Sequence, residues 1–485
     1  MPAYLSPVIG GHHPDASVCR VGEDHYLVCS SFEYFPAVPI CHSRDLVRWR
    51  QIGNVLARPD QVRLPADVPA SRGIRTPTIR HHDGRFHVIA TNASAGGTFL
   101  VTAERPTGPW SDPVRVDLPG DAPDLAWDDD GGCWCVTPAG QVARINPTTG
   151  AVLDGPWQAW PGGRGRGTPR LHRVGDWWYL VSAHRHGLDV ARARTPRGPF
   201  EPAPADLGGP PIRGADRADL VDTPDGQWWL VLSGARPDAH GTGPETVLAR
   251  VRQEDGWLVV DGDAGVPPVP ESRHPSPPPR EDFDEFTLDP CWISPRERRH
   301  GSWSLTERPG WLTLRATGDT LDRPGCTFFG RRLRDRDSRV SVRLDPGTAR
   351  AGLSIRCDEA HHYDLEVVSG RVDVVARIGP VRQVVASRTV HPGPVTLTVV
   401  TRTDDLVPPS FVRPTDEPTG VEPTGPDTIA FHVDDDPGPL AELNGRYLSP
   451  AFTGGPAGRV VGMYVTRGVA AFDWFDHRDR LTPAG

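Results

Sequence analysis

The chain has 485 residues with 53 basic and 62 acidic side chains, and its net charge of −9 argues against nucleic acid or an anionic membrane surface as the main partner. All 53 basic residues are arginine, so sites that need a P-loop lysine or a Schiff-base lysine are excluded. The 52 glycines and 54 prolines interrupt helices and favour turns. The expected partner is a small soluble molecule.

The amino-terminal stretch MPAYLSPVIGG has no basic segment followed by an apolar run. No run of about 18 apolar residues occurs elsewhere, so the sequence predicts no signal peptide, no membrane span and a cytoplasmic location. The eight cysteines lack the paired spacing of a zinc site, which favours buried, reduced thiols.

A short hairpin pattern recurs through the first half of the chain, in which a turn rich in Gly and Asp precedes alternating aromatic and aliphatic residues. Its five copies are VGEDHYLVCS, HDGRFHVIAT, DDGGCWCVTP, VGDWWYLVSA and PDGQWWLVLS. Their turn glycines lie 62, 47, 44 and 51 residues apart, close to the length of a four-stranded blade. We predict an all-β chain in which residues 1–265 form a five-bladed β-propeller, with a β-sandwich of coincidentally similar hairpins as the alternative.

The second half of the chain has a different pattern. Residues 266–281 are rich in proline and predict a stiff linker. Residues 282–485 contain short alternating strands such as SWSLTE, WLTLRA and HYDLEVV, which predict a two-sheet β-sandwich. Residues 407–427 predict a disordered loop. Because the first strands of propeller blades converge on a central funnel, functional residues are expected at or just before those strands.

Several strings resemble glycoside hydrolase family 43, in its branch of β-xylosidases and α-arabinofuranosidases with a C-terminal concanavalin-like sandwich. They include HHPDASVCRVGEDHYLVCSSFEYFP, GIRTPTIRHHDGRFHVIATN, DLAWDDDG and RADLVDTPDGQWWLVLSGARP. The resemblance covers nearly the whole chain and implies inverting hydrolysis by three carboxylates, with base and acid about 6.5–9.5 Å apart. It implies that Asp15 of HHPDAS is the base, whereas an aspartate capping the turn after Pro14 is the alternative.

Two of the three implied carboxylates are missing. Where the family reads G-I-D-P, this chain has Ala122 in GDAPDLAW, and Asp121 substitutes only if the backbone is irregular, because neighbouring strand residues point to opposite faces. Where the family has the glutamic acid of P-E-G-P-H-L-Y, this chain has Gly167 in GRGTPRLH. Loss of a positioned proton donor costs roughly 10²–10⁴-fold in rate, so ordinary hydrolysis is expected to be impaired.

Arginine replaces other residue types around the implied funnel. Arg75 stands where the resemblance implies tryptophan, and Arg217 where it implies histidine. The altered acid loop adds three more, and the family itself predicts one in GARP: Arg164, Arg166, Arg170 and Arg236. Since guanidinium groups bind carboxylates and phosphates bidentately, these residues predict an anionic, sugar-like ligand. For the loop arginines, pairing with surface acids is the alternative.

The resemblance also implies a substrate wall of Phe32, Tyr34 and Phe35, for which packing between blades is the competing explanation. It implies a substrate contact at Asn92. His184 and His186 are weaker candidates for holding a proton donor.

No cofactor or catalytic metal is expected. A structural calcium near three aspartates of the second half is one interpretation, and ordinary turn aspartates are the other: Asp282, Asp284 and Asp473.

Three functions fit these residues. In the first, which we favour, Asp15 acts as the base of an elimination, isomerisation or cyclisation on an anionic sugar-like substrate that the arginines orient. In the second, weak or conventional β-xylosidase or α-arabinofuranosidase hydrolysis persists, with Asp121 or a histidine replacing the lost acid. In the third, the chain binds a sugar without chemistry.

Overall fold

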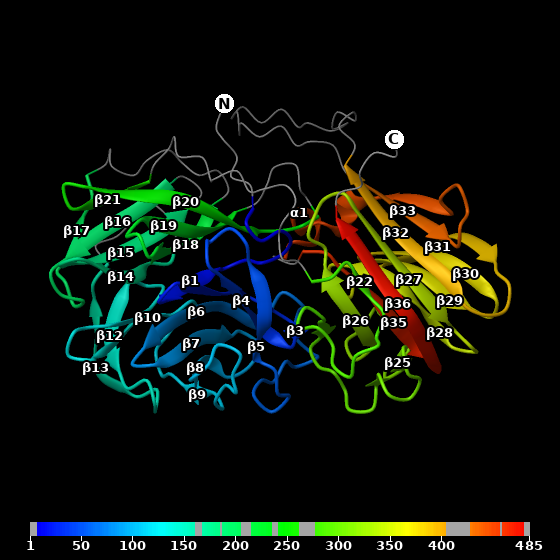
Figure 1. Ribbon diagram of the computed structural model, residues 1–485, viewed down its shortest axis with the longest axis horizontal. Helices are drawn as coiled ribbons and strands as arrows, with labels where there is room; N and C mark the ends of the chain where they lie inside the picture. Colours follow the sequence, from blue (N-terminus) through cyan, green and yellow to red (C-terminus); the bar gives the residue numbers. More distant parts are fainter. Residues whose placement is uncertain are drawn as a thin grey trace.

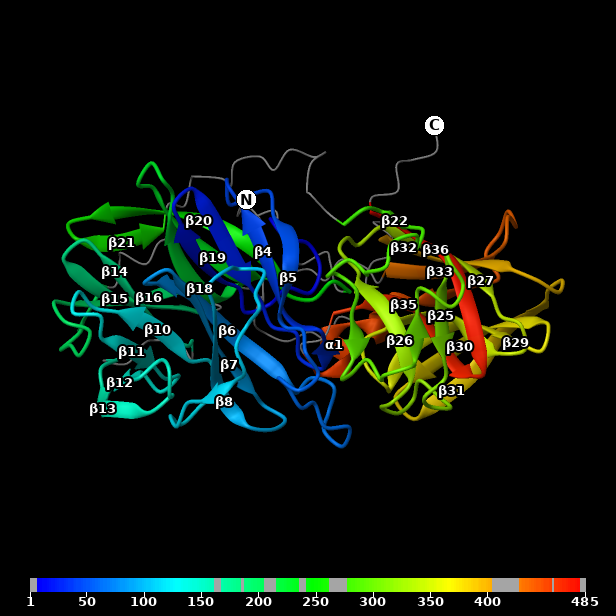
Figure 2. The ribbon, with the colours of Figure 1, turned by 60° about the horizontal axis from the view of Figure 1, so that its bottom comes forward.

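The computed structural model describes residues 7–160, 167–184, 187–204, 215–234, 241–260, 277–403, 427–455 and 458–479, without the side chains of residues 215 and 216. Two β-rich bodies lie side by side, the first blue to green and the second yellow-green to red (Figures 1 and 2). Several predicted positions lie outside the described residues: Arg164, Arg166, His186, Arg236, most of the linker 266–281 and nearly all of the loop 407–427.

The described part of the first body forms five antiparallel sheets of four strands each. In chain order these sheets consist of β1 (Ser17–Val21), β2 (Asp24–Val28), β4 (Ala37–Ser43) and β5 (Arg50–Leu56); β6 (Ile74–His82), β7 (Arg85–Asn92), β8 (Gly97–Ala103) and β9 (Val114–Arg115); β10 (Asp124–Trp127), β11 (Cys133–Val136), β12 (Gln141–Ile145) and β13 (Val152–Gln158); β14 (Arg170–Val174), β15 (Trp177–His184), β16 (Gly187–Ala193) and β17 (Glu201–Pro202); and β18 (Ala215–Asp222), β19 (Trp228–Gly234), β20 (Glu245–Glu254) and β21 (Trp257–Val260).

Each predicted hairpin joins the first two strands of one sheet. Its turn glycine adopts a left-handed conformation in all five sheets, with φ between 59° at Gly175 and 80° at Gly226, where only glycine avoids steric cost. The first strands contact one another in the cyclic order β1, β6, β10, β14, β18 and back to β1, which closes a ring. The predicted all-β fold of a propeller followed by a sandwich is confirmed, and the sheets of the described residues are the arrangement expected of five blades.

Polar side chains from all five first strands meet inside the ring. Ser17 Oγ donates to Asp219 Oδ2 at 2.5 Å, and Arg170 Nη1 donates to Thr78 Oγ1 at 2.7 Å. Asp124 Oδ2 accepts the backbone N–H of Leu171 in the next blade at 2.6 Å. These contacts join first strands of different blades, so burial of the polar groups depends on the ring being closed.

Arg80 on β6 links the two buried aspartates of this network. Its Nη2 lies 2.7 Å from Asp124 Oδ1 and its Nη1 lies 2.9 Å from Asp219 Oδ2. Burial alone would raise the pKa of the Asp219 carboxyl, but Arg80, Arg170 and His172 hold it well below its usual range. We call Ser17, Thr78, Arg80, Asp124, Arg170, His172 and Asp219 the central network.

The second body is a sandwich of two antiparallel sheets, with one short α-helix, α1 (Pro450–Thr453), and a 3₁₀ turn over Gly445–Leu448. The first sheet consists of β22 (Arg280–Glu281), β24 (Trp303–Ser304), β25 (Leu312–Arg315), β27 (Ser338–Asp345), β32 (Val395–Thr403), β33 (Asp427–Val433), β34 (Ala441–Asn444) and β36 (Val469–Asp479). The second consists, in spatial order, of β26 (Thr327–Arg332), β35 (Val460–Arg467), β28 (Arg350–Arg356), β29 (His361–Val368), β30 (Arg371–Ile378) and β31 (Val381–Thr389).

Alternate residues of these strands, such as Val342, Leu353, Leu365 and Met463, form one buried apolar core. A two-stranded sheet of β3 (Tyr34–Phe35) and β23 (Ser294–Pro295) connects the propeller to the sandwich. Arg296 extends this connection by donating to the carbonyl oxygens of Pro65 at 2.6 Å and Val68 at 2.8 Å. The two domains therefore share a hydrogen-bonded boundary.

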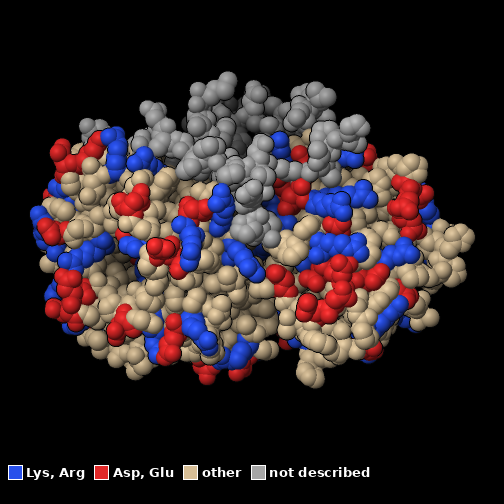
Figure 3. All heavy atoms as spheres, viewed as in Figure 1, with Lys and Arg blue, Asp and Glu red and all other residues tan. Residues whose placement is uncertain are grey.

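The surface is mixed in charge. Acidic and basic side chains are interspersed over the face shown in Figure 3. Among the described residues, none of the helices has the length and apolar character needed to cross a membrane.

We predict that Asp219→Ala will destabilise the propeller by about 3–5 kcal/mol, because it leaves Arg80 and Arg170 buried without this carboxylate. Thermal unfolding followed by circular dichroism measures the loss. The matched control is Asp222→Ala on the same strand, which removes a partly exposed pair with Arg20 and should cost about 0–1 kcal/mol. Equal losses in the two variants would contradict a structural role for the central network.

Candidate functional site

Strained residues mark the start of the first strands. Two residues before Ser17, Thr78, Asp124 and Asp219 stand four non-glycine residues with left-handed backbone, namely Asp15 (φ 58°), Thr76 (φ 54°), Ala122 (φ 65°) and Arg217 (φ 55°). This conformation costs roughly 1–2 kcal/mol for a non-glycine residue. Strain held at corresponding positions of several blades indicates a site at this end of the ring.

Asp15 is held by residues of the first and fifth blades. Ser30 Oγ donates to Asp15 Oδ2 at 2.5 Å, and Arg217 Nε lies 2.5 Å from Asp15 Oδ1. The backbone N–H of Asp15 donates to Ser233 Oγ at 2.7 Å, while Ser30 Oγ also accepts the N–H of Thr76 at 2.7 Å. Both carboxylate oxygens are therefore oriented, and the side chain is only 13% exposed.

The other predicted charged residues form pairs of their own. Arg75 makes an ion pair with Asp121, and the two side chains are 33% and 41% exposed. Arg217 also donates from Nη1 to Thr168 Oγ1 at 3.1 Å. We call Asp15, Arg75, Asp121 and Arg217 the strand-start cluster; Ser30 links its two ion pairs, because its hydroxyl contacts both Asp15 and the N–H of Thr76, the residue after Arg75.

Arg170 lies deeper, in the central network, 3.5 Å from Asp219 and 4.0 Å from Asp124. Each of these arginines thus has a carboxylate neighbour. The described charges of the strand-start cluster and central network balance, with four aspartates and four arginines. The site is therefore not an open cationic pocket within the described residues.

The two positions that lack the implied carboxylates differ in their surroundings. Ala122 is buried and left-handed, so the backbone is irregular there, as a role for Asp121 requires. At Gly167, an added Cβ would lie 2.2 Å from Ser182 Oγ and 2.4 Å from the carbonyl oxygen of Ala183. No side chain fits at Gly167 unless β15 moves, which excludes a glutamate on this backbone.

The aromatic residues of SSFEYFP lie in different surroundings. Phe32 stacks on His12 with ring centroids 5.5 Å apart and is left-handed at φ 49°. Tyr34, in contrast, packs with Ile293, Phe328, Val460 and Tyr464 between the domains. The ring of Tyr34 therefore lies in the domain boundary, which favours packing over a substrate wall as its role. Phe35 is also buried, in the strand that pairs with β23.

Asn92 and His184 serve local structure. The Asn92 amide nitrogen donates to the carbonyl oxygen of Arg63 at 2.9 Å, and its oxygen accepts the N–H groups of Ser94 and Ala95. Its amide thereby organises the loop after β7. The Nε2 atom of His184 lies 3.4 Å from Oδ2 of Asp189 on the neighbouring strand β16.

The sandwich reaches the strand-start cluster through Arg332. Its guanidinium Nη2 donates to the carbonyl oxygen of Ser30 at 3.3 Å, and the hydroxyl of the same serine holds Asp15. Arg332 is buried at the domain boundary. The C-terminal domain therefore positions the residue that orients the candidate base.

Glu33 lies three residues after Ser30 in the chain, and its side chain is buried, with 1% of the residue exposed. Burial, together with the nearby carboxylate of Glu359, raises the pKa of Glu33 to about 8, although Arg356 and Arg296 act in the opposite direction. A neutral glutamic acid is therefore favoured at this boundary over much of the physiological range.

A calcium site finds no support in the described part of the chain, where no group of three or more His, Cys, Asp or Glu side chains is gathered as metal ligands. Asp282 instead pairs with Arg280 at 2.7 Å. All eight cysteines are free.

The sequence reasoning missed Ser30, Thr168, Arg332 and all of the central network except Arg170. A signal for the network was present, since residues 15–17, 76–78, 122–124, 168–170 and 217–219 read DAS, TPT, APD, TPR and RAD. In each triplet the third residue is polar and joins the network. An alignment of the five triplets would have distinguished the residues of the central network, at the third position, from the residues at the first position, near the strand starts. Arg332 had no such signal because it comes from the other domain.

Comparison with known proteins gives a consistent result. Residues 4–258 match the family description "Glycosyl hydrolases family 43", and residues 280–417 match "Beta xylosidase C-terminal Concanavalin A-like domain". A non-reducing end α-L-arabinofuranosidase of Bacteroides ovatus is 34% identical, with 98% of this chain and 94% of the relative covered. A xylosidase/arabinosidase of Butyrivibrio fibrisolvens is 34% identical, covering 78% and 82%.

Solved structures show the same two-domain arrangement. A family 43 structure from Bacteroides ovatus, described as belonging to a xyloglucan PUL, superposes with a TM-score of 0.86 at 31% identity, covering 98% of this chain and 100% of its own. The family 43 protein BlXynB of Bacillus licheniformis superposes with a TM-score of 0.84 at 28% identity, covering 98% and 99%.

We predict that Gly167→Ala will lower stability by about 1–3 kcal/mol, because the new methyl group meets Ser182 and the Ala183 carbonyl. Gly438→Ala is the control, since a Cβ there meets nothing within 4 Å. Thermal unfolding of both variants measures the difference. A Gly167→Ala protein as stable as the control would show that the position has room for a side chain.

We predict that Glu33→Gln will be more stable than the parent chain at about pH 8. The raised pKa of Glu33 contributes stability below its usual value of 4.5, and this contribution is lost as pH rises toward about 8. The amide needs no proton, so the unfolding midpoint of Glu33→Gln should depend less on pH across this window. Glu23→Gln, at an exposed turn, should follow the parent chain. Parallel pH profiles for Glu33→Gln and the parent would refute the assignment.

Proposed function

Because the chain belongs to glycosyl hydrolase family 43, we propose that it acts on a small sugar-derived substrate at the strand-start cluster, and that Asp15 is its base. The proposed reaction is an elimination, isomerisation or cyclisation, rather than hydrolysis with a carboxylic acid as proton donor. The observation that carries it is Gly167, where the chain has neither a carboxylate nor space for one.

The geometry around Asp15 supports proton abstraction. Ser30 and Arg217 orient its two carboxylate oxygens, and a base needs this fixed orientation toward the proton that it removes. Negative charge then develops on the substrate. Arg217 and Arg75 lie in the same cluster and carry fixed positive charge that stabilises an oxyanion without donating a proton.

An anionic group on the substrate would bind Arg75. The Arg75–Asp121 pair is partly exposed on both sides, so its ionic contribution is small and an incoming carboxylate can replace Asp121. A carboxylate next to the reacting carbon would also make the adjacent proton more acidic. A sugar acid is therefore the substrate class that we propose.

A second candidate is conventional hydrolysis of α-L-arabinofuranosides or β-xylosides. It is favoured by the relatives, which carry the names α-L-arabinofuranosidase and xylosidase/arabinosidase and align over most of the chain. Aryl and alkyl glycosides separate the candidates, because an activated aryl leaving group needs little acid assistance. Efficient cleavage of alkyl α-L-arabinofuranosides would overturn the non-hydrolytic proposal.

We predict that the parent chain will exchange a carbon-bound proton of a pentonic or uronic acid for deuterium in D₂O, measured by NMR. Asp15→Asn should slow this exchange by roughly 10²–10⁴-fold, because the base is lost while Arg217 and Ser30 remain. Asp225→Asn, at an exposed turn, is the control. Exchange that is equal in Asp15→Asn and the parent chain would exclude Asp15 as the base, and binding without exchange would favour a non-catalytic role.

A further inference from the structure

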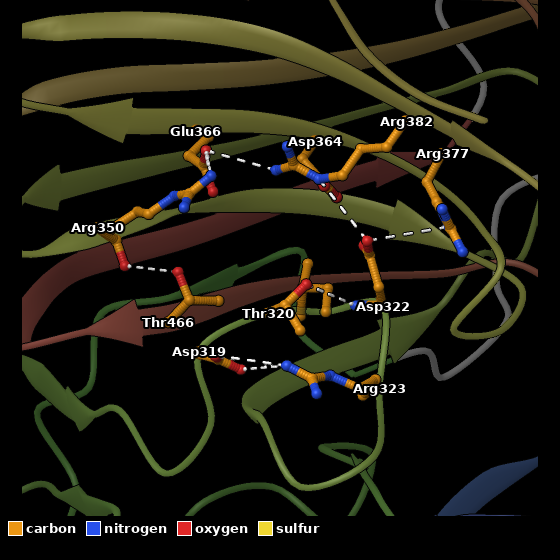
Figure 4. A pocket seen from close by; sticks show the side chains of 11 residues that line it. Asp319, Thr320, Asp322, Arg323, Arg350, Asp364, Glu366, Arg377, Arg382 and Thr466 are labelled. Carbon is orange, nitrogen blue, oxygen red and sulfur yellow. Dashed lines mark hydrogen bonds and ion pairs between the residues drawn. The ribbon is translucent and has the colours of Figure 1, made fainter. Parts of the chain in front are cut away.

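The sandwich contains a polar cavity of its own, away from the strand-start cluster. It has a volume of about 490 Å³ and lies between the six-stranded sheet and the segment Asp319–Arg323 (Figure 4). The sheet contributes side chains from β28, β29, β30, β31 and β35: Arg350, Asp364, Glu366, Arg377, Arg382 and Thr466. A cavity of this size is within the range that holds small molecules.

Charged residues on this face are buried although they do not face the apolar core. On β29, Tyr363, Leu365 and Val367 belong to the core, whereas Asp364 and Glu366 alternate with them and are only 2% and 4% exposed. Buried carboxylates are costly unless they are paired or perform a function. The outward face of β29 is thus a buried polar surface.

A second layer of side chains fixes the carboxylates. Glu366 accepts Arg350 Nη2 at 2.6 Å and the Tyr464 hydroxyl at 3.3 Å. His362 lies between Asp364, at 2.9 Å, and Asp322, at 3.2 Å. Burial disfavours the charged imidazole, but these two carboxylates raise the pKa of His362 to about 9. The acids lining the cavity are therefore oriented before any ligand binds.

The charge balance limits the class of ligand. Four acidic and four arginine side chains line the cavity, so their charges cancel, and His362 behind them adds a single positive charge. Among the described residues no group of metal-ligating side chains is gathered. The lining contains no aromatic ring. A ligand held here must be recognised by many hydrogen bonds rather than by net charge or ring stacking.

Three guanidinium–carboxylate pairs of the cavity lining stand just beyond hydrogen-bond distance. Arg382 lies 3.8 Å from Asp322 and 3.9 Å from Glu366, and Arg377 lies 3.9 Å from Asp322. These distances are too long for direct hydrogen bonds. A hydroxyl group that lies on the cavity side of such a pair can accept from the guanidinium and donate to the carboxylate, so neighbouring hydroxyls of one molecule would bridge adjacent pairs.

We propose that this cavity is a second binding site, distinct from the propeller, for a neutral polyhydroxyl ligand, namely a free sugar or the end of a short oligosaccharide. Arg382, Asp322 and Glu366 recognise its hydroxyl groups, while Arg350, Tyr464 and His362 hold the carboxylates in place. The proposal is independent of the reaction at Asp15.

The test is titration calorimetry of the full chain with L-arabinose, D-xylose, D-galactose and xylotriose. It is repeated in Asp15→Asn so that binding at the propeller is recognised separately. At least one of these sugars should show a binding event that Asp15→Asn retains and that Arg382→Ala weakens about tenfold or more. Arg388→Ala is the matched control, because this arginine of the same strand pairs with Asp436 outside the cavity lining.

A second variant, Thr320→Trp, fills the cavity from its covering segment and should also remove this binding event. Circular dichroism checks that both variants are folded. If the folded Arg382→Ala and Thr320→Trp proteins bind the sugars as the parent chain does, or if none of the four sugars binds outside the propeller, the proposal is wrong. Either result leaves the exchange reaction of Asp15 to be judged on its own assay.

Discussion

The propeller depends on a buried network of ion pairs at its centre. Asp219 and Asp124 would be strongly unfavourable in an apolar ring, yet Arg80 contacts both, and Arg170 lies within 4.0 Å of both. Because the participants come from strands separated by up to about two hundred residues, no local segment can satisfy them. Neutralisation of these groups therefore requires the ring to be closed.

That fixed geometry sets the chemistry at the strand starts. Two residues before the central network, Asp15 and Arg217 are held in left-handed conformations and meet at 2.5 Å. The sandwich contributes from outside, since Arg332 supports Ser30, which in turn holds Asp15. The C-terminal domain is therefore part of the architecture of the site, in addition to having a polar cavity of its own.

The fold was accessible from sequence because its signals are local. Turn glycines such as Gly22 and Gly226 and the alternation of the following strands depend on a few neighbouring residues, and the structure forms hairpins there. The family resemblance, which relates distant blades, led us to expect Arg217 in the same funnel as Asp15, but not their direct contact. What sequence did not reveal depends on contacts between distant atoms. The crowding at Gly167 comes from β15, the burial of Tyr34 comes from the sandwich, and the pairing of Arg75 with Asp121 joins two blades.

The residues of the central network and the residues two positions before them differ in how freely they can be substituted. Residues 17, 78, 124, 170 and 219 are bound to one another, so a change at any one of them disturbs its neighbours. Residues 15, 76, 122, 168 and 217 already differ widely within this single chain, as Asp, Thr, Ala, Thr and Arg. Side chains at residues 15, 76, 122, 168 and 217 can thus be replaced while the central network stays intact. This makes the ring a suitable starting point for installing new catalytic activities.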